Sequence, residues 1–228
     1  MALPKRWINV TDPGWLFCRS TPRLTAWFST YTEGHEAFQD TVVHSLWLTA
    51  LVAAPLGLGG TLCAEPIISL LFGPAYAPAV PALQILAWAM ALIILRGTYR
   101  QAFNAVRRPR LDLRCAGISV GLNVVLNVLL IPRYGMRGAA VATLVSETLW
   151  LTMAAYYFSR DVMPVRLLPL LWQPGVAALA MGAVFMLTQP LFWAVRALLS
   201  VLVYCGVFLL LETTAIGPFI SRRKVYVP

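Results

Sequence analysis

The chain has 228 residues, of which 59% are hydrophobic and 12% charged, and its formal net charge is +9. A mean hydropathy of +0.73 leaves too little polar surface to cover a water-soluble globule. A nucleic-acid-binding protein would need basic residues and exposed aromatic residues together on a soluble face. The sequence offers no soluble segment long enough for such a face, so we expect an integral membrane protein without a nucleic-acid partner.

Six apolar runs approach the roughly 20 residues that a helix needs to cross a bilayer. In chain order they are Val42–Ala64, Val80–Thr98, Cys115–Ile131, Ala139–Phe158, Leu167–Thr188 and Leu191–Leu211. These runs are continuously apolar and rich in Leu and Ala, whereas barrel strands alternate with period two over about 10 residues. The sequence therefore predicts an all-α membrane protein with about six transmembrane helices.

The predicted organisation has four parts. They are a cytoplasmic N-terminal segment (1–41), a four-helix part (42–160), an additional, lipid-facing transmembrane helix pair (161–211) and a basic cytoplasmic tail (212–228). Inside the first apolar run, Pro55 is followed by three glycines, which favours a kinked or locally loosened helix there.

The basic residues are sorted by these runs. When the runs alternate sides, all but three of the 18 Lys and Arg residues fall on one face of the membrane. The exceptions are Arg133, Arg137 and Arg196. By the positive-inside rule both termini are then cytoplasmic, and the turn at Ile131–Ala140 lies outside.

A polar stripe is predicted on the second helix. Arg96, Arg100, Asn104 and Arg107 recur at helical spacing, which aligns them on one face. Because guanidinium groups bind phosphate oxygens through paired hydrogen bonds, this stripe could hold a lipid-linked diphosphate. Alternatively, these arginines anchor the helix by reaching to anionic headgroups. Arg96 lies deepest and is the most informative to test.

Polar residues also occur inside the third and fourth runs. Asn123 and Glu147 lie equally far from the turn, which places both near the bilayer midplane, and Asn127 with Thr143 would form a second polar rung. A carboxyl group at that depth must be protonated, paired or hydrated. Glu147 could face a hydrated cavity, where it senses protonation or contacts a sugar hydroxyl. Alternatively, these residues are interhelical hydrogen-bonding partners.

Two stripes of small residues accompany them. Gly117 with Gly121, and Gly138 with Ala142 and Ser146, repeat every fourth residue, a spacing that lets helix backbones approach closely. The four cysteines are too scattered for a metal site or a disulfide framework, and neither histidine has a suitably spaced catalytic partner. We therefore predict no metal, no cofactor and no enzymatic activity.

Three motifs together resemble a known family. They are Ala64–Tyr76, Ala82–Ala87, and Leu126–Gly135 with Gly138–Thr143 and Ser146-Glu147. Their order and spacing resemble the C-terminal half of polysaccharide exporters, which are oligosaccharide-lipid flippases of the multidrug/oligosaccharidyl-lipid/polysaccharide flippase superfamily. The resemblance implies helices nine to fourteen of a fourteen-helix transporter. Arg107-Arg108 departs from the family pattern, which often has Gly before a basic residue.

The resemblance implies a partial flippase, truncated or split, for a lipid-linked oligosaccharide in polysaccharide biosynthesis. Its surroundings would be lipids of the bacterial cytoplasmic membrane. Because the cationic cavity residues of the family are expected mainly on the missing helices, a second chain would have to supply the first lobe. The alternatives are a fragment of a cation-coupled drug antiporter, a membrane enzyme acting on polyprenyl-linked sugars, and a non-functional remnant.

Overall fold

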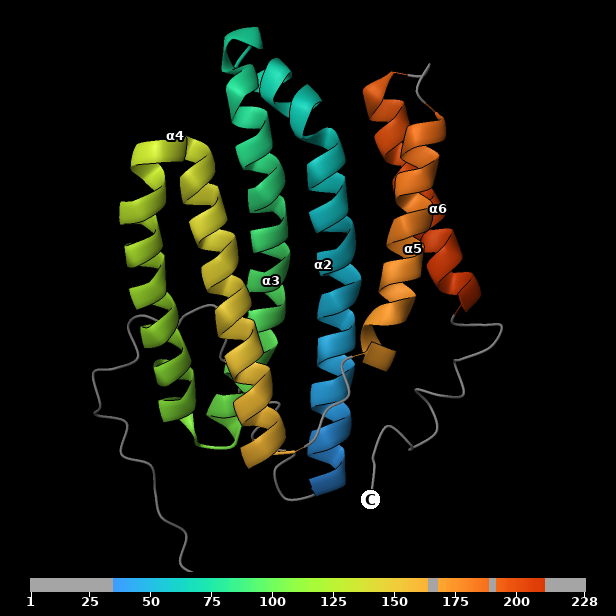
Figure 1. The fold of residues 1–228 in the computed structure, drawn as a ribbon. Coiled ribbons are helices and arrows are strands. Elements are labelled where there is room, and N and C mark those ends of the chain that lie inside the picture. Colours follow the sequence, from blue (N-terminus) through green and yellow to red (C-terminus); the bar gives the residue numbers. More distant parts are fainter. Residues whose placement is uncertain (1–34, 164–167, 189–191, 212–228) are drawn as a thin grey trace, which may run out of the picture.

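The computed structural model describes residues 35–163, 168–188 and 192–211, which form the antiparallel helical bundle in Figure 1. The elements are α2 (His35–Leu71), the short 3-10 helix η2 (Pro74–Ala79), α3 (Val80–Ala105), α4 (Pro109–Asp161), α5 (Leu168–Leu187) and α6 (Trp193–Leu211). The predicted all-α class is confirmed. The predicted N-terminal segment lies mostly, and the basic tail wholly, outside the described residues.

Helix α4 folds back on itself at Gly135 and so forms two antiparallel helices of the bundle (Figure 1). We call the part before Gly135 the first arm of α4 and the part after it the second arm. Gly135 has φ 54° and ψ −131°, a conformation that is open to glycine and strained for a residue with a Cβ atom. The fold-back thus lies within the turn predicted at Ile131–Ala140. Each of the six predicted apolar runs therefore corresponds to one helix or one arm of α4.

Length and composition support several membrane crossings. Among the described residues, four segments are long and apolar enough to span a bilayer, namely Phe38–Leu71, Pro74–Ala105, Pro109–Asp161 and Trp193–Leu211. The third of these contains the fold-back at Gly135, and α5 contributes a shorter apolar segment, Trp172–Leu187. The chain is thus a multi-pass membrane protein.

The two ends of the bundle differ in their number of arginines. The Gly135 turn, η2 and the first turn of α6 lie at one end, which we call the turn end (Figure 1). The start of α2 and the α3–α4 junction lie at the other, which we call the arginine-rich end. Arg107, Arg108, Arg110, Arg114 and Arg160 lie at this second end.

Glycines in α2 bring α3 close to it. A Cβ atom on Gly60 would lie 2.7 Å from the Cβ atom of Ala87, and one on Gly57 would lie 3.1 Å from the ring of Trp88. Helix α2 remains helical from His35 to Leu71, although Pro55 has no N–H to donate to the carbonyl oxygen of Leu51. That carbonyl oxygen accepts a hydrogen bond from the hydroxyl of Tyr204 in α6 instead, and the part of α2 nearest the turn end bends aside in Figure 1. The predicted kink of this helix is therefore observed, and the glycines beyond Pro55 pack closely against α3.

Helices α5 and α6 dock on α2 through two long-range hydrogen bonds. The indole Nε1 of Trp47 donates to Gln173 Oε1 at 3.2 Å, and the hydroxyl of Tyr204 donates to the carbonyl oxygen of Leu51 at 2.7 Å. The outer face of α6 leaves Leu198 and Leu202 exposed. This arrangement is compatible with the predicted lipid-facing pair.

Candidate functional site

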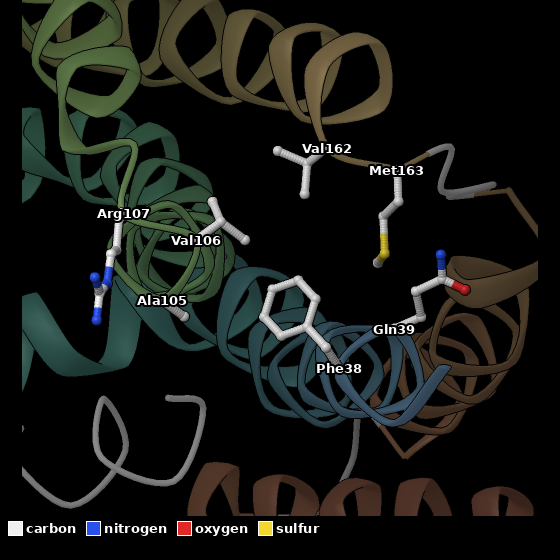
Figure 2. Close-up of a pocket in the computed structure, with 7 residues that line it drawn as sticks. All are labelled: Phe38, Gln39, Ala105, Val106, Arg107, Val162 and Met163. Carbon is white, nitrogen blue, oxygen red and sulfur yellow. The ribbon is translucent and has the colours of Figure 1, made fainter. Parts of the chain in front are cut away.

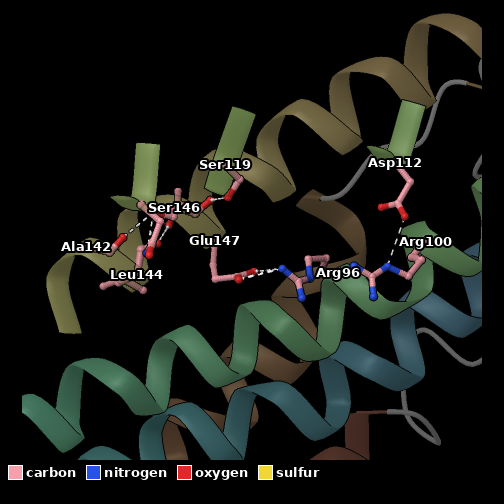
Figure 3. Close-up of polar contacts among 10 residues, drawn as sticks. Arg96, Arg100, Asp112, Ser119, Ala142, Leu144, Ser146 and Glu147 are labelled. Carbon is pink, nitrogen blue, oxygen red and sulfur yellow. Dashed lines mark hydrogen bonds and ion pairs between the residues drawn. The ribbon is translucent and has the colours of Figure 1, made fainter. Parts of the chain in front are cut away.

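An ion pair joins α3 to the second arm of α4. Nη1 of Arg96 lies 2.8 Å and 2.9 Å from the two carboxylate oxygens of Glu147 (Figure 3), and the two side chains are 24% and 14% exposed. The Arg96 guanidinium also lies over the ring of the fully buried Trp150, 5.4 Å from its centroid. Both contacts offset the cost of holding a charge away from water. Glu147 was expected to be protonated, paired or hydrated, and in the structure it is paired with Arg96.

The other residues of the predicted stripe do not form one surface. Nε of Arg100 lies 3.4 Å from Asp112 Oδ2 near the start of α4, in a pair in which the arginine side chain is 44% exposed (Figure 3). Asn104 is exposed. Arg107 lies beyond the end of α3 with φ 56°, so it is not on the helical stripe. The prediction of four aligned residues is wrong at Arg107, because α3 ends at Ala105.

Hydrogen bonds connect the two arms of α4 at the level of the ion pair. Ser119 Oγ donates to the carbonyl oxygen of Ser146 at 2.7 Å, and Asn123 Nδ2 donates to Ser146 Oγ at 3.1 Å. Asn127 Nδ2 donates to Asn123 Oδ1 at 2.8 Å, which extends the network by one helical turn. Because Ser146 precedes Glu147, Asn123 lies at about the level of the ion pair along the bundle.

The predicted pairing of Asn127 with Thr143 across the two arms of α4 does not form. Thr143 Oγ1 donates to the carbonyl oxygen of Ala139 in its own helix at 3.0 Å, and the amide of Asn127 is bonded to Asn123. A threonine in a helix can always bond to the preceding turn of its own backbone, so spacing alone does not pair it across a hairpin. Thr143 is therefore outside the amide network.

Only one of the two small-residue stripes brings backbones together. A Cβ atom on Gly138 would lie 2.5 Å from the carbonyl oxygen of Leu130, whereas one on Gly117 or Gly121 would meet no described atom within 4 Å. Gly138 and Ala142 are buried, but Gly117 and Gly121 are exposed. Close approach is observed for the second arm of α4, whereas Gly117 and Gly121 contact no other helix in the described part of the chain.

A cavity of about 320 Å³ lies at the arginine-rich end, between α2, α3 and the end of α4 (Figure 2). Its lining residues are Phe38, Gln39, Ala105, Val106, Arg107, Val162 and Met163. The Arg107 side chain points away from the others in Figure 2, so the cavity does not gather the basic residues of this end. Within the described ranges, no group of three or more His, Cys, Asp and Glu residues could hold a metal ion.

Sequence reasoning missed two members of the site. Trp150 stacks beneath the Arg96 guanidinium, and Ser119 bonds the two arms of α4. Trp150 follows Glu147 by three residues, so it shares the same helix face, and this spacing could have identified it. Ser119 precedes Asn123 by four residues, so these two residues also share a helix face, and the spacing could have identified Ser119 in the same way.

Long apolar helices around a shielded ion pair and hydrogen-bonded amides define a polytopic membrane protein with a polar interior between α3 and α4. The family model described as Lipid II flippase MurJ matches residues 24–213, and the chain belongs to this family. The family resemblance expected from the three sequence motifs is thereby confirmed.

Curated relatives agree with this assignment. The chain is 30% identical over 141 residues to the probable low-salt glycan biosynthesis flippase Agl15 of Haloferax volcanii, covering 62% of this chain and 29% of that protein. It is 31% identical over 147 residues to the probable flippase AglR of the same organism, covering 63% of this chain and 30% of that protein. The matches thus span less than a third of these relatives.

A solved structure shares the fold. It is described as Lipid II flippase MurJ, inward closed conformation, and matches with a TM-score of 0.71 at 17% identity. The match covers 86% of this chain and 42% of that chain. The helices described above therefore correspond to part of a flippase fold.

Proposed function

We propose that this chain forms part of a flippase that moves lipid-linked sugar precursors across the membrane in glycan biosynthesis. Its membership of the Lipid II flippase MurJ family and its similarity to a glycan biosynthesis flippase support this proposal. The observation that carries a role for this chain's own residues is the ion pair of Arg96 and Glu147 inside apolar helices. Ionisable groups inside membrane-spanning helices are rare and commonly line substrate or ion pathways.

Arg96 exchanges partners in the proposed cycle. In the present structure its guanidinium is bound to the Glu147 carboxylate at 2.8 Å. A diphosphate oxygen offers the same charge-assisted hydrogen bonds, so a lipid-linked diphosphate can replace the carboxylate. Once released, Glu147 can take a proton or contact a sugar hydroxyl. Asn123 lies at about the level of the ion pair, and Asn127, one helical turn further, extends the polar path toward the turn end.

The substrate pathway requires more helices than this chain provides. Rocking of one lobe against another around a central site is the usual mechanism of such transporters. Because the fold match covers 42% of the solved flippase chain, we propose that a second chain supplies the remaining helices. The transported lipid would then pass between that chain and the polar face formed by α3 and α4.

Complementation tests this function. We expect the chain alone to leave glycan export unrestored in a host depleted of its own flippase, and co-expression with the N-terminal helices of Agl15 to restore it. Export is measured by surface labelling of the glycan, and membrane abundance by immunoblotting. Failure of every combination, with both chains present in the membrane, would contradict the proposed function.

We further propose that the arginine-rich end faces the cytoplasm of a bacterial cell and that both termini lie there. The larger number of arginines at that end supports this orientation through the positive-inside rule. The same rule applies across cytoplasmic membranes, whatever the cell envelope outside them.

Cysteine labelling tests the orientation. In a variant without the native cysteines, we expect a membrane-impermeant maleimide to label Arg133→Cys in intact spheroplasts. Both Arg133 and Arg110 are exposed, but they lie at opposite ends of the bundle, so Arg110→Cys should react only after permeabilisation. The reverse pattern would invert the orientation.

A further inference from the structure

A second, separate polar cavity of about 560 Å³ lies near the turn end of the bundle, between α2, α3, α5 and α6. Ligand sites in proteins commonly enclose about 300–1,000 Å³, so this volume suits a small polar group. Glu65 of α2, Gln84 of α3 and Arg196 of α6 line it, with Trp193 beside them. None of its lining residues belongs to the ion pair or to the hydrogen bonds between the arms of α4.

Arg196 is held in place with part of its guanidinium unused. Its Nε and Nη2 donate to the carbonyl oxygen of Phe185 at 3.2 Å and 2.9 Å, and its guanidinium centre lies 4.1 Å from the centroid of the Phe185 ring. Within the described part of the chain, its Nη1 has no hydrogen-bond partner. The cavity therefore contains an oriented cationic donor.

Acceptors line the same cavity from α2 and α3. Glu65 is exposed and, among the described residues, forms no ion pair with Arg196 or any other cation. Gln84 Nε2 donates to the carbonyl oxygen of Thr61 at 3.3 Å, which leaves Gln84 Oε1 available as an acceptor. A ligand that satisfies both sides must carry an anionic group and a hydrogen-bonding cation.

The depth of these residues indicates where such a ligand comes from. Arg196 lies in the first turn of α6, and Glu65 lies six residues before the end of α2, or about 9 Å along a helix. Tryptophan is enriched at the level of lipid headgroups, and Trp193 lies beside the cavity in the first turn of α6, at the turn end of the bundle. The cavity thus meets the headgroup region of a membrane rather than its centre.

We propose that this cavity binds the headgroup of a zwitterionic phospholipid with a primary ammonium group, such as phosphatidylethanolamine. Arg196 binds the phosphate, and Glu65 with Gln84 accepts hydrogen bonds from the ammonium. A purely anionic headgroup satisfies Arg196 but is repelled by Glu65. A quaternary ammonium headgroup lacks the N–H donors that Gln84 and Glu65 require.

Native mass spectrometry of the purified full chain in neutral detergent measures this preference. We expect phosphatidylethanolamine to bind at least fivefold more tightly than phosphatidylcholine or phosphatidylglycerol of the same acyl chains. Arg196→Gln should weaken phosphatidylethanolamine and phosphatidylglycerol by at least tenfold. Glu65→Gln should weaken phosphatidylethanolamine severalfold and strengthen phosphatidylglycerol, which a merely misfolded variant would not do.

Arg133→Gln is the matched control, because Arg133 is an exposed arginine at the same end of the bundle but outside the cavity. Its lipid affinities should equal those of the unmodified chain. Equal affinity for all three lipids, or lipid binding that neither cavity variant alters, would overturn the proposal. Competition by soluble glycerophosphoethanolamine at the concentration of the lipid would also overturn it, since the ligand would then not be a membrane lipid.

Discussion

Glu147→Gln is expected to destabilise the helical bundle more than any other single polar substitution in the described residues. The change leaves the Arg96 guanidinium over Trp150 without its carboxylate, in a site where only 24% of the arginine side chain is exposed. Removing one partner of a fully buried ion pair costs about 3–5 kcal/mol. Because Arg96 retains some exposure, we expect the free energy of unfolding to fall by about 2 kcal/mol. Thermal unfolding in detergent measures this loss.

The double variant Arg96→Gln with Glu147→Gln separates structure from transport. It removes both charges and lets the two amides bond to each other, so it should recover most of the lost stability. If Arg96 exchanges Glu147 for a diphosphate, transport in the assembled flippase should stay low despite that recovery. Recovery of both stability and transport, with unchanged pH dependence, would reduce the ion pair to a structural contact.

Arg100→Gln is the matched control for this experiment. It removes another arginine that pairs with a carboxylate of α4, but its side chain is 44% exposed and the closest atoms are 3.4 Å apart. The Asp112 side chain is 19% exposed, but because the arginine of this pair is exposed to solvent, we expect the substitution to cost about 1 kcal/mol. A loss of stability as large as that of Glu147→Gln would show that burial does not distinguish the two pairs.

Gly138→Ala is expected to force the arms of α4 apart. The new Cβ atom would lie 2.5 Å from the carbonyl oxygen and 2.7 Å from the carbonyl carbon of Leu130, and backbone atoms cannot rotate away as a side chain can. Overpacking of this kind costs about 1–3 kcal/mol. Thermal unfolding should show this loss, and crosslinking between cysteines at Asn123 and Ser146 should become less efficient.

Gly117→Ala and Gly121→Ala are the controls for Gly138→Ala. Both glycines have the same four-residue spacing, but no described atom lies within 4 Å of the Cβ position of either. Replacing an unconstrained helical glycine by alanine stabilises a helix by about 0.5–1 kcal/mol. We therefore expect unchanged or slightly raised stability, and a large loss at Gly121 would indicate an interface with helices that the structure does not contain.

Most of the fold was predictable because its signals are local. The length of an apolar run, the glycine at the Gly135 turn and the sorting of arginines between the ends each depend on residues close together in the sequence. Each predicted apolar run accordingly corresponds to one helix of the bundle or one arm of α4. The family, too, could be recognised from short motifs around Pro66, Gln84 and Gly135, and the match to residues 24–213 confirms it.

The sequence by itself thus determined the helices, the fold-back and the unequal number of arginines at the two ends. Only the tertiary structure decided which faces meet: Arg96 with Glu147 across 51 positions, Gly138 against Leu130, and Glu65 with Arg196 around one cavity. The physical reason is rotation about the helix axis. An apolar helix in lipid has little amphipathic pattern to orient it, so contacts with neighbouring helices set which residues point inward.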